Sequence, residues 1–211
     1  MKKYVFFDFN GTILDDVDLC LNLLNDILVM QGKETITKED YRNIFCFPIK
    51  KYYEAAGIDF NMNSFEELSL DFIKKYQPAS FKCNINKNLL KTVEKLKLDG
   101  YTVGILSASE INNLTEQLKV LGIYDQFDFV LGLDNIHAAS KVEVAKEFIK
   151  NNHIDGNNII FIGDTDHDAL VSKSINAKCF LYTNGHQSKD VLRKCNEIMI
   201  NDFLDIFSYL K

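Results

Sequence analysis

The sequence predicts an α/β fold, in which a Rossmann-like, three-layer core with a parallel sheet carries a small inserted α-helical cap. Short apolar runs alternate with segments of helical periodicity over most of the chain, as in a parallel sheet with helices on both faces. Residues 16–83 interrupt this alternation with helical patterns alone. The 211 residues suffice for one core domain and a small accessory unit. We therefore expect residues 1–15 and 84–211 to form the core, and residues 16–83 the cap.

The core strands are predicted from short apolar runs. Tyr4–Phe9 is apolar almost throughout, as a strand covered on both faces should be. The other expected strands are Tyr101–Leu106, Phe127–Leu131, Asn158–Ile162 and Ala177–Tyr182. Helices are expected between them, where apolar residues recur every three or four positions. These stripes are Leu89, Val93 and Leu96; Ile111, Leu114 and Leu118; and Val142, Ala145 and Phe148.

The inserted segment is predicted to be wholly helical. A long amphipathic stripe runs from Val17 to Leu28, and shorter helical patterns follow at Thr37–Phe45, at Pro48–Ala56 and from Phe65 to Tyr76. An insertion directly after the first strand would lie over the carboxyl end of that strand. Ligands bind at this end of open α/β sheets, so we expect the cap to cover the functional site.

Composition excludes several classes of protein. The net charge is −6, and no cluster of Lys and Arg stands clear of acidic neighbours, which argues against nucleic-acid binding. The five cysteines are odd in number, far apart and without C-x-x-C spacing, so neither a zinc site nor a disulfide framework is expected. No apolar run approaches the roughly 20 residues of a membrane span. We expect a soluble, cytoplasmic protein, as a monomer or weak homodimer.

Acidic residues follow two of the predicted strands. Asp8 opens the run Asp8-Phe9-Asn10-Gly11-Thr12, and Asp164 and Asp168 lie in Gly163–Asp168 after the strand Asn158–Ile162. Alone, Asp8 could simply cap a turn. If the two strands are parallel neighbours, however, these carboxylates meet at one edge of the sheet, where they would repel each other without a cation. Hard oxygen ligands favour Mg²⁺, so the sequence predicts a magnesium site.

A hydroxyl and a lysine complete this pattern. Ser107 ends the strand Tyr101–Leu106, where it could hold a phosphoryl oxygen or cap the next helix. Lys141 begins an expected helix, which is an unfavourable place for a structural cation. It could face an anion there, or lie at the surface.

In these four clusters the chain resembles the haloacid dehalogenase superfamily of hydrolases, in the phosphoglycolate-phosphatase-like branch with a helical cap. The resemblance implies that Asp8 is a nucleophile that forms an aspartyl-phosphate. It implies that Mg²⁺ is bound by Asp8, the backbone carbonyl of Asn10, Asp164 and Asp168, and that Asp15 lies at the hinge into the cap. The residues implied to hold the phosphoryl group are Gly11, Thr12, Ser107, Ala108 and Lys141.

Asn10 departs from the family pattern, in which a second aspartate protonates the leaving oxygen. An amide cannot transfer this proton, and general acid–base catalysis is commonly worth ~10²–10⁴ in rate. The leading hypothesis is a Mg²⁺-dependent phosphatase for a small phosphorylated metabolite, slow or suited to good leaving groups. A phosphonate or haloacid hydrolase, with Lys50 or Lys51 as a Schiff base in the phosphonatase case, is a second. A phosphate-binding or regulatory protein without useful turnover is a third.

Substrate choice is expected in the cap, because the core clusters handle only the phosphoryl group. The segment Phe45–Tyr52 joins two predicted helices and mixes aromatic with basic residues, so Phe47 and Lys50 are candidate substrate contacts. A simple helix–helix turn is an equal alternative. Asn184–Gln187 could form a rim loop in which His186 is either functional or a surface residue. His167 is expected as a hydrogen-bonding loop residue rather than a catalyst.

Overall fold

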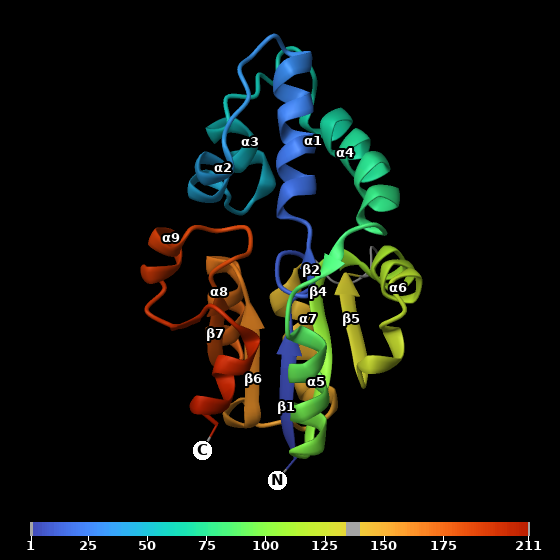
Figure 1. Ribbon diagram of the computed structural model, residues 1–211, viewed down its shortest axis with the longest axis vertical. Helices are drawn as coiled ribbons and strands as arrows, with labels where there is room; N and C mark the ends of the chain where they lie inside the picture. The colour runs from blue at the N-terminus through green and yellow to red at the C-terminus, as the bar shows by residue number, and fades with distance from the viewer. Residues whose placement is uncertain (1, 134–139, 211) are drawn as a thin grey trace.

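A parallel six-stranded sheet forms the centre of the part of the chain that the computed structural model describes, residues 2–133 and 140–210. The strand order is β5-β4-β1-β6-β7-β8, and every pair is parallel (Figure 1). The strands are β1 (Lys3–Phe7), β4 (Tyr101–Glu110), β5 (Phe129–Leu133), β6 (Ile159–Gly163), β7 (Lys178–Tyr182) and β8 (Ile198–Ile200). As predicted, the first strand pairs directly with β6.

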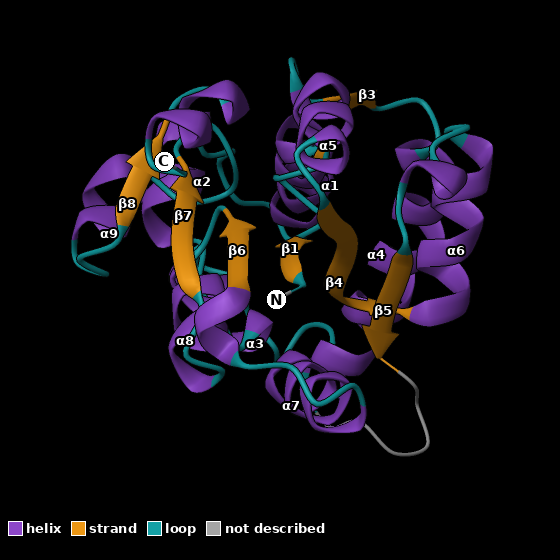
Figure 2. Ribbon diagram, turned by 90° about the horizontal axis from the view of Figure 1, so that it is seen from below, coloured by secondary structure: helices purple, strands orange, loops and turns teal. Residues whose placement is uncertain are grey.

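Helices cover both faces of this sheet (Figure 2). One face is covered by α5 (Leu89–Leu98), α6 (Ile111–Val120) and the 3₁₀ segment η3 (Phe203–Ser208). The other is covered by α7 (Lys141–Asn151) and α8 (Asp166–Ser174), while α9 (Lys189–Arg193) packs near the β7–β8 edge. Two short 3₁₀ turns, η1 (Tyr124–Gln126) and η2 (Gly156–Asn158), precede β5 and β6. The result is the three-layer core that the sequence predicts.

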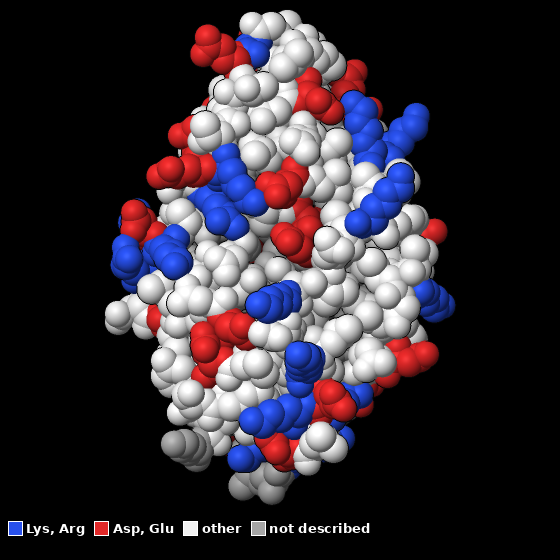
Figure 3. Space-filling view, in the orientation of Figure 1, with Lys and Arg blue, Asp and Glu red and all other residues white. Residues whose placement is uncertain are grey.

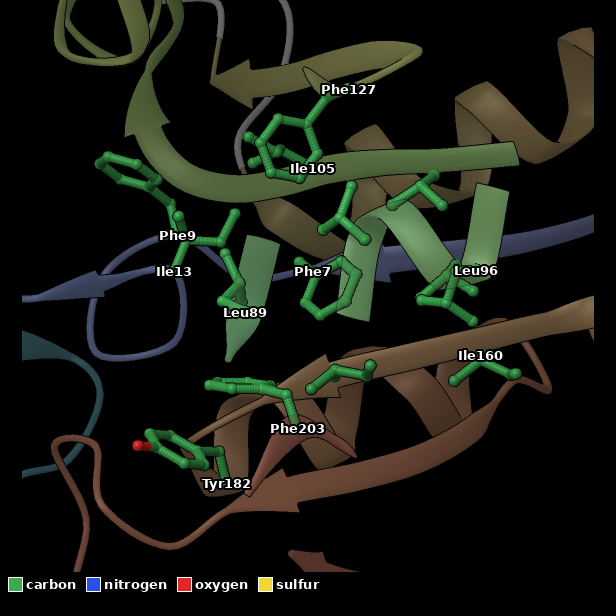
Figure 4. Close-up of a cluster of buried hydrophobic side chains, with 14 of the residues drawn as sticks. Phe7, Phe9, Ile13, Leu89, Leu96, Ile105, Phe127, Ile160, Tyr182 and Phe203 are labelled. Carbon is green, nitrogen blue, oxygen red and sulfur yellow. The ribbon is translucent and has the colours of Figure 1, made fainter. Parts of the chain in front are cut away.

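The apolar run of β1 is buried on both faces because its side chains alternate. Val5 and Phe7 point into the cluster with α5 and η3, whereas Phe6 points into the cluster with α7 and α8. In Figure 4 the ring of Phe7 lies among the side chains of Leu89 and Leu96, from α5, and of Phe203. Burying this strand on both sides anchors the residues that follow it.

The cap is a separate helical unit with its own apolar cluster. Its helices are α1 (Val17–Met30), α2 (Lys38–Ile44), α3 (Ile49–Ala55) and α4 (Phe65–Ser80). α2 and α4 begin with capping boxes at Thr37 and Ser64, where side chain and backbone bond reciprocally. Figure 1 shows this unit above the carboxyl ends of β1 and β4. The segment 16–83 contains no strand among its residues, all of which are described, in agreement with its pattern.

A two-residue antiparallel ladder joins the two crossings between core and cap. β2 (Leu14–Asp15) carries the chain into the cap, and β3 (Asn84–Ile85) carries it back. Asp15 therefore lies at the crossing, next to Asn84. The ladder thus brings the two covalent connections between core and cap together at one place.

The predicted strand bounds differ from the observed bounds by a few residues, mostly one or two. The main exception is β4, which continues past Leu106 to Glu110 and brings Ser107 into the strand. The sequence reading omitted β8 and the β2–β3 ladder, which are too short to show periodicity. Within the described ranges, no helix has both the length and the apolar character needed to span a membrane. On the face in Figure 3, acidic and basic side chains are interspersed.

Candidate active site

Four side chains predicted from separate motifs meet at the carboxyl end of the sheet. Asp8 directly follows β1 and Asp164 directly follows β6, and these strands are paired neighbours. The amide of Asp8 continues the ladder by donating to the carbonyl of Ile162, at 2.8 Å. Ser107 lies in β4, on the other side of β1, and Lys141 is the first residue of α7. Asp8, Ser107 and Lys141 all line one cavity.

Lys141 is a buried cation that joins two acids. Its ammonium donates to Oδ1 of Asp8 at 2.5 Å and to Oδ1 of Asp168 at 2.6 Å, and only 3% of the residue is exposed. Burial alone would lower the pKa of Lys141, but the carboxylates of Asp168 and Asp8 hold it above its ordinary value. Lys141 thus stays charged beside Asp8, and a surface position is excluded.

Asp168 is held by the start of α8. Its Oδ2 accepts from the backbone amides of Asp164 and Thr165, at 3.0 and 2.9 Å, and from the Thr165 hydroxyl at 2.7 Å. Thr165 and Asp168 form a capping box, which explains why the sequence places this pair before a helix. Burial raises the pKa of Asp168, but the Lys141 ammonium and these donors bring it below the ordinary value. Asp168 therefore fixes the position of the Lys141 side chain.

Asp164 is fully buried in a close-fitting cradle. Its Oδ1 accepts from the hydroxyl of Thr12 at 2.8 Å, and its Oδ2 accepts from the amide of His186 at 2.6 Å. A Cβ on Gly11 would approach Oδ2 of Asp164 to 2.3 Å, and a Cβ on Gly185 would approach it to 2.2 Å. Gly11 also has a φ of +70°, which favours glycine. Thr12 and Gly11 thus position an acid, and neither lines the cavity.

The residues present fit a divalent cation. Asp8, Asp164 and Asp168 are all buried, and one ligand oxygen from each lies within 4.8 Å of the others. Burial, together with the charges of Asp168 and Asp164, raises the pKa of Asp8 to about 8 against the opposing charge of Lys141. Burial likewise raises the pKa of Asp164 to about 6. A hard cation would relieve this accumulation of negative charge.

Ser107 and its neighbours line the side of the cavity formed by β4. Ser107 is 1% exposed, and its Oγ accepts from the amide of Ser109 at 3.1 Å. It does not cap α6, because Glu110 does so. Ala108 and Ser109 line the same cavity.

Asn10 is held by hydrogen bonds that explain why an amide suits this position. Its Nδ2 donates to Oδ2 of Asp16 at 3.0 Å and to the hydroxyl of Tyr76 at 2.5 Å, and its Oδ1 accepts from the hydroxyl of Ser109 at 3.0 Å. A carboxylate here would face the buried carboxylate of Asp16 at the same distance. The amide is therefore complementary to an acid that the family motif does not include.

Asp16 is the central residue that sequence reasoning missed. It is fully buried at the start of α1, and it accepts from the amide of Gly11 at 2.7 Å and from the Tyr76 hydroxyl at 2.6 Å. His186 Nε2 lies 3.2 Å from Oδ1 of Asp16. The adjacent acids Asp15-Asp16, before an amphipathic helix, were the signal in the sequence.

His186 is buried, so it is not the surface residue that the sequence left open as one alternative. Its Nδ1 shares a hydrogen bond with the Tyr41 hydroxyl at 2.7 Å, and its ring stacks on Phe45, with centroids 4.8 Å apart. Burial alone would lower the pKa of His186, but the charge of Asp16 raises it to about 9. His186 therefore forms an ion pair with Asp16.

The cavity between core and cap has a volume of about 390 Å³. Phe47 lines it, as expected, and packs on the ring of His167, with centroids 4.9 Å apart. His167 lies in the first turn of α8, so its expected position in a loop was wrong. Lys50 is exposed, and its ammonium lies over the ring of Phe60. It does not line the cavity, so the structure does not bring this candidate to the site.

The loop after β7 joins the core to the cap through hydrogen bonds. We call this loop, residues 184–188, the clasp. The amide of Ser188 donates to the carbonyl of Arg42 at 2.9 Å, and Nε2 of Gln187 donates to the carbonyl of Phe45 at 3.0 Å. The Arg42 guanidinium donates in turn to the carbonyl of Asn184. The clasp thus holds α2 over the cavity.

Comparison with known proteins identifies the family and the fold of this chain. The family model described as haloacid dehalogenase-like hydrolase matches residues 5–182. A phosphoglycolate phosphatase of Psychrobacter arcticus is 24% identical over 99% of this chain and 96% of its own, and the pyrophosphatase PpaX of Bacillus velezensis is 22% identical over 82% of this chain and 80% of its own. A haloacid dehalogenase-like hydrolase of Streptococcus pneumoniae has the same fold, with a TM-score of 0.84 at 17% identity, covering 100% of this chain and 99% of its own.

Proposed function

This chain belongs to the haloacid dehalogenase-like hydrolase family, and we propose that it is a Mg²⁺-dependent phosphatase that hydrolyses a small phosphorylated metabolite through an aspartyl-phosphate on Asp8. The observation that carries the proposal is the arrangement of Asp8. Its carboxylate is bonded to a buried ammonium, lies within reach of two further acids, and lines a cavity together with Ser107. Relatives named as phosphatases support the same reaction class.

The chain's own residues would perform the transfer as follows. Because Lys141 is bonded to Oδ1 of Asp8, attack on phosphorus would come from Oδ2, and the bond from phosphorus to the leaving oxygen would break as the new bond forms. Lys141 and the hydroxyl of Ser107 would hold the phosphoryl oxygens. Water would then hydrolyse the aspartyl-phosphate and regenerate Asp8.

Asp8, Asp164 and the backbone carbonyl of Asn10 would hold Mg²⁺, with Asp168 nearby. When bound, the ion would neutralise charge on the carboxylates and on the phosphoryl group. Burial raises the pKa of Asp8, but the nucleophile must be ionised to attack phosphorus. A bound cation would stabilise the ionised form. Asn10 cannot protonate the leaving oxygen, so turnover would be slow or confined to good leaving groups.

The other hydrolase chemistries have less support. A phosphonatase of the kind considered above needs a cap lysine in the cavity, and Lys141 is the one lysine among the described residues that line it. A haloacid hydrolase has no use for the acids Asp164 and Asp168. A phosphate-binding protein without turnover would have the same site, and the assay of phosphate release distinguishes it from a phosphatase.

The test is phosphate release from an aryl phosphate, with and without Mg²⁺, for the wild type and for Asp8→Asn. We expect release that needs Mg²⁺ and falls by about 10⁴-fold or more in the variant. Asp8→Asn should fold normally, because it removes one of three crowded carboxylates. Its thermal unfolding provides the control. Activity that survives in Asp8→Asn would contradict the proposed nucleophile, and binding of phosphate without any release would favour the non-catalytic alternative.

A further inference from the structure

The cap side of the cavity differs in chemistry from the core side. It is formed mainly by aromatic and branched aliphatic side chains, among them Phe47, Ile49, Tyr53, Phe65, Phe72 and Ile73. Phe47 and Ile73 are partly exposed, with 38% and 51% of their surface accessible, although both are large and apolar. Apolar surface that faces a cavity is a favourable contact for an apolar ligand.

The tyrosine hydroxyls nearest the core are already bonded to protein groups. Tyr41 is bonded to His186, and Tyr76 is bonded to Asp16 and Asn10. These residues therefore present ring carbon to the cavity rather than hydrogen-bonding groups. Their chemistry suits a ring or a hydrocarbon better than a polyhydroxylated group.

The rings also hold each other in place. Phe72 stacks on Tyr76 with the ring planes 9° apart, and Tyr53 meets Phe65 edge to face, with centroids 6.0 Å apart. Such pairs lose little freedom when a ligand binds, and a further ring can join them by stacking or edge contact.

The cavity offers no unpaired lysine or arginine for the leaving group among the described residues that line it. Lys141 is the one Lys or Arg in that set, and it is bonded to Asp8 and Asp168. His186 is paired with Asp16. A carboxylate on the leaving group would lose its hydration without gaining a cation, which is costly.

We propose that the substrate is a phosphate monoester of an uncharged, aromatic alcohol or phenol, whose ring lies in the cap half of the cavity while its phosphoryl group lies at Asp8. This inference rests on the proposed function and narrows it. It predicts a preference unlike the activity that the name phosphoglycolate phosphatase gives to several relatives, since glycolate is a small, charged leaving group.

The experiment compares three aryl phosphates of similar leaving-group chemistry that differ in charge, with phosphoglycolate added as a charged alkyl ester. The values of kcat/KM are measured with Mg²⁺ for naphthyl phosphate, phenyl phosphate, para-carboxyphenyl phosphate and phosphoglycolate. We expect naphthyl and phenyl phosphate to exceed the carboxyphenyl ester by about 100-fold, the upper range for discrimination by an apolar pocket. A carboxyphenyl ester or phosphoglycolate used as well as phenyl phosphate would overturn the inference but leave the proposed phosphatase intact.

A charge introduced into the cap provides the matched test. Ile73→Arg places a cation on the cavity side of α4, whereas Leu70→Arg places one on the same helix, at a residue that is 71% exposed and does not line the cavity. We expect Ile73→Arg to raise kcat/KM for the carboxyphenyl ester at least about tenfold relative to phenyl phosphate, and Leu70→Arg to leave the ratio unchanged. Equal changes in both variants would overturn the inference.

Binding distinguishes failure of this inference from failure of the proposed function. Benzylphosphonate and para-carboxybenzylphosphonate have a methylene group in place of the ester oxygen, so a phosphatase cannot hydrolyse them. Their affinities are measured by calorimetry in the presence of Mg²⁺. Tighter binding of the uncharged analogue by about tenfold or more supports the aromatic site, even if no ester is turned over. Equal or reversed affinities overturn it, whatever the outcome of the hydrolysis assay.

Discussion

The core side and the cap side of the cavity differ in the chemistry of the residues that line them. On the core side, charged groups are buried and each is held by named partners: Lys141 by two acids, Asp168 by the start of α8, and Asp164 by Thr12 and a backbone amide. On the cap side, rings pack against rings, and part of their apolar surface faces the cavity. In the proposed function the core half would hold the phosphoryl group. The cap half would select the group to which it is attached, by size and polarity.

This division predicts that variants of the core residues that hold the phosphoryl group change the rate for every substrate alike, whereas cap variants change the ranking of substrates. The sharpest core test is Lys141→Met, which removes the ammonium but keeps a flexible side chain of similar length. We expect kcat to fall by about 10³-fold for aryl and alkyl phosphates equally, because charge on the phosphoryl group is no longer stabilised. Steady-state kinetics on both substrate classes measure it.

The control for this variant is Lys146→Met, which changes the same charge on an exposed part of α7. It should keep wild-type kcat. Lys141→Met leaves Asp8 and Asp168 without their cation, so denaturant unfolding must show that the protein is still folded in the assay. A loss confined to one substrate class would contradict the division between core and cap.

The second prediction concerns Asn10, where the core meets the cap through Asp16 and Tyr76. Asn10→Asp restores an acid, and we expect kcat on an alkyl phosphate to rise by about 10²-fold, with a smaller rise on an aryl phosphate, whose leaving group needs a proton less. The new carboxyl would lie beside Asp16, whose charge raises its pKa, so the gain should extend from mildly acidic toward neutral buffer.

The swap Asn10→Asp with Asp16→Asn is the matched control, because it moves the acid without adding a second one. It should show the gain only in more acidic buffer, because without the charge of Asp16 the new acid loses its proton at a lower pH. No gain in either variant would mean that residue 10 does not limit turnover, and would remove the proposed reason for slow chemistry.

The third prediction is that Mg²⁺ binds to the carboxylates of the core and thereby changes how thermal stability depends on pH. The folded pKa values of Asp8, about 8, and of Asp164, about 6, are raised above the ordinary value of 3.8. Stability from such groups is present below the unfolded pKa and is lost as the pH rises through the folded pKa, so the metal-free protein should melt at lower temperature at about pH 8 than at about pH 5. Saturating Mg²⁺ should restore about 5–10 °C at the higher pH and less at the lower.

Differential scanning fluorimetry measures both trends, with Asp164→Asn as the control. This variant keeps the size of the side chain but weakens the metal site and removes one crowded charge. It should melt higher than the wild type without Mg²⁺ at about pH 8 and respond less to the ion. An undiminished response to Mg²⁺ would place the ion elsewhere.

The sequence predicted the core half well and the cap half poorly, for physical reasons. Asp8, Ser107 and Asp164 follow apolar strands, and parallel strands must end at one edge, so their meeting follows from pattern alone. The cap side of the cavity is formed by helices whose apolar residues could equally have packed among themselves. Periodicity does not tell a buried ring from one that lines a cavity.

Asp16 and His186 show a second limit of sequence reading. They are 170 positions apart in the chain, and their pairing depends on where the clasp meets the start of α1. Neither lies in a motif with fixed spacing, and the sequence alone favours neither a buried nor a surface position for His186. Contacts between a cap and a returning loop are set by tertiary packing, which a single sequence does not reveal.

The smallest predicted effect tests the clasp, which joins the two halves. Arg42→Ala removes the side-chain donor to the carbonyl of Asn184 but keeps the backbone bond from Ser188. A single hydrogen bond is worth about 0.5–1.5 kcal/mol, so we expect KM to rise by about threefold to tenfold as the cap is held less firmly, with kcat little changed. Arg193→Ala, at an exposed arginine of α9 that pairs with Asp190, should alter neither constant. If Arg42→Ala lowered kcat for all substrates as Lys141→Met does, the clasp would act on the chemistry of the core rather than on access through the cap, and the two halves would not be separable.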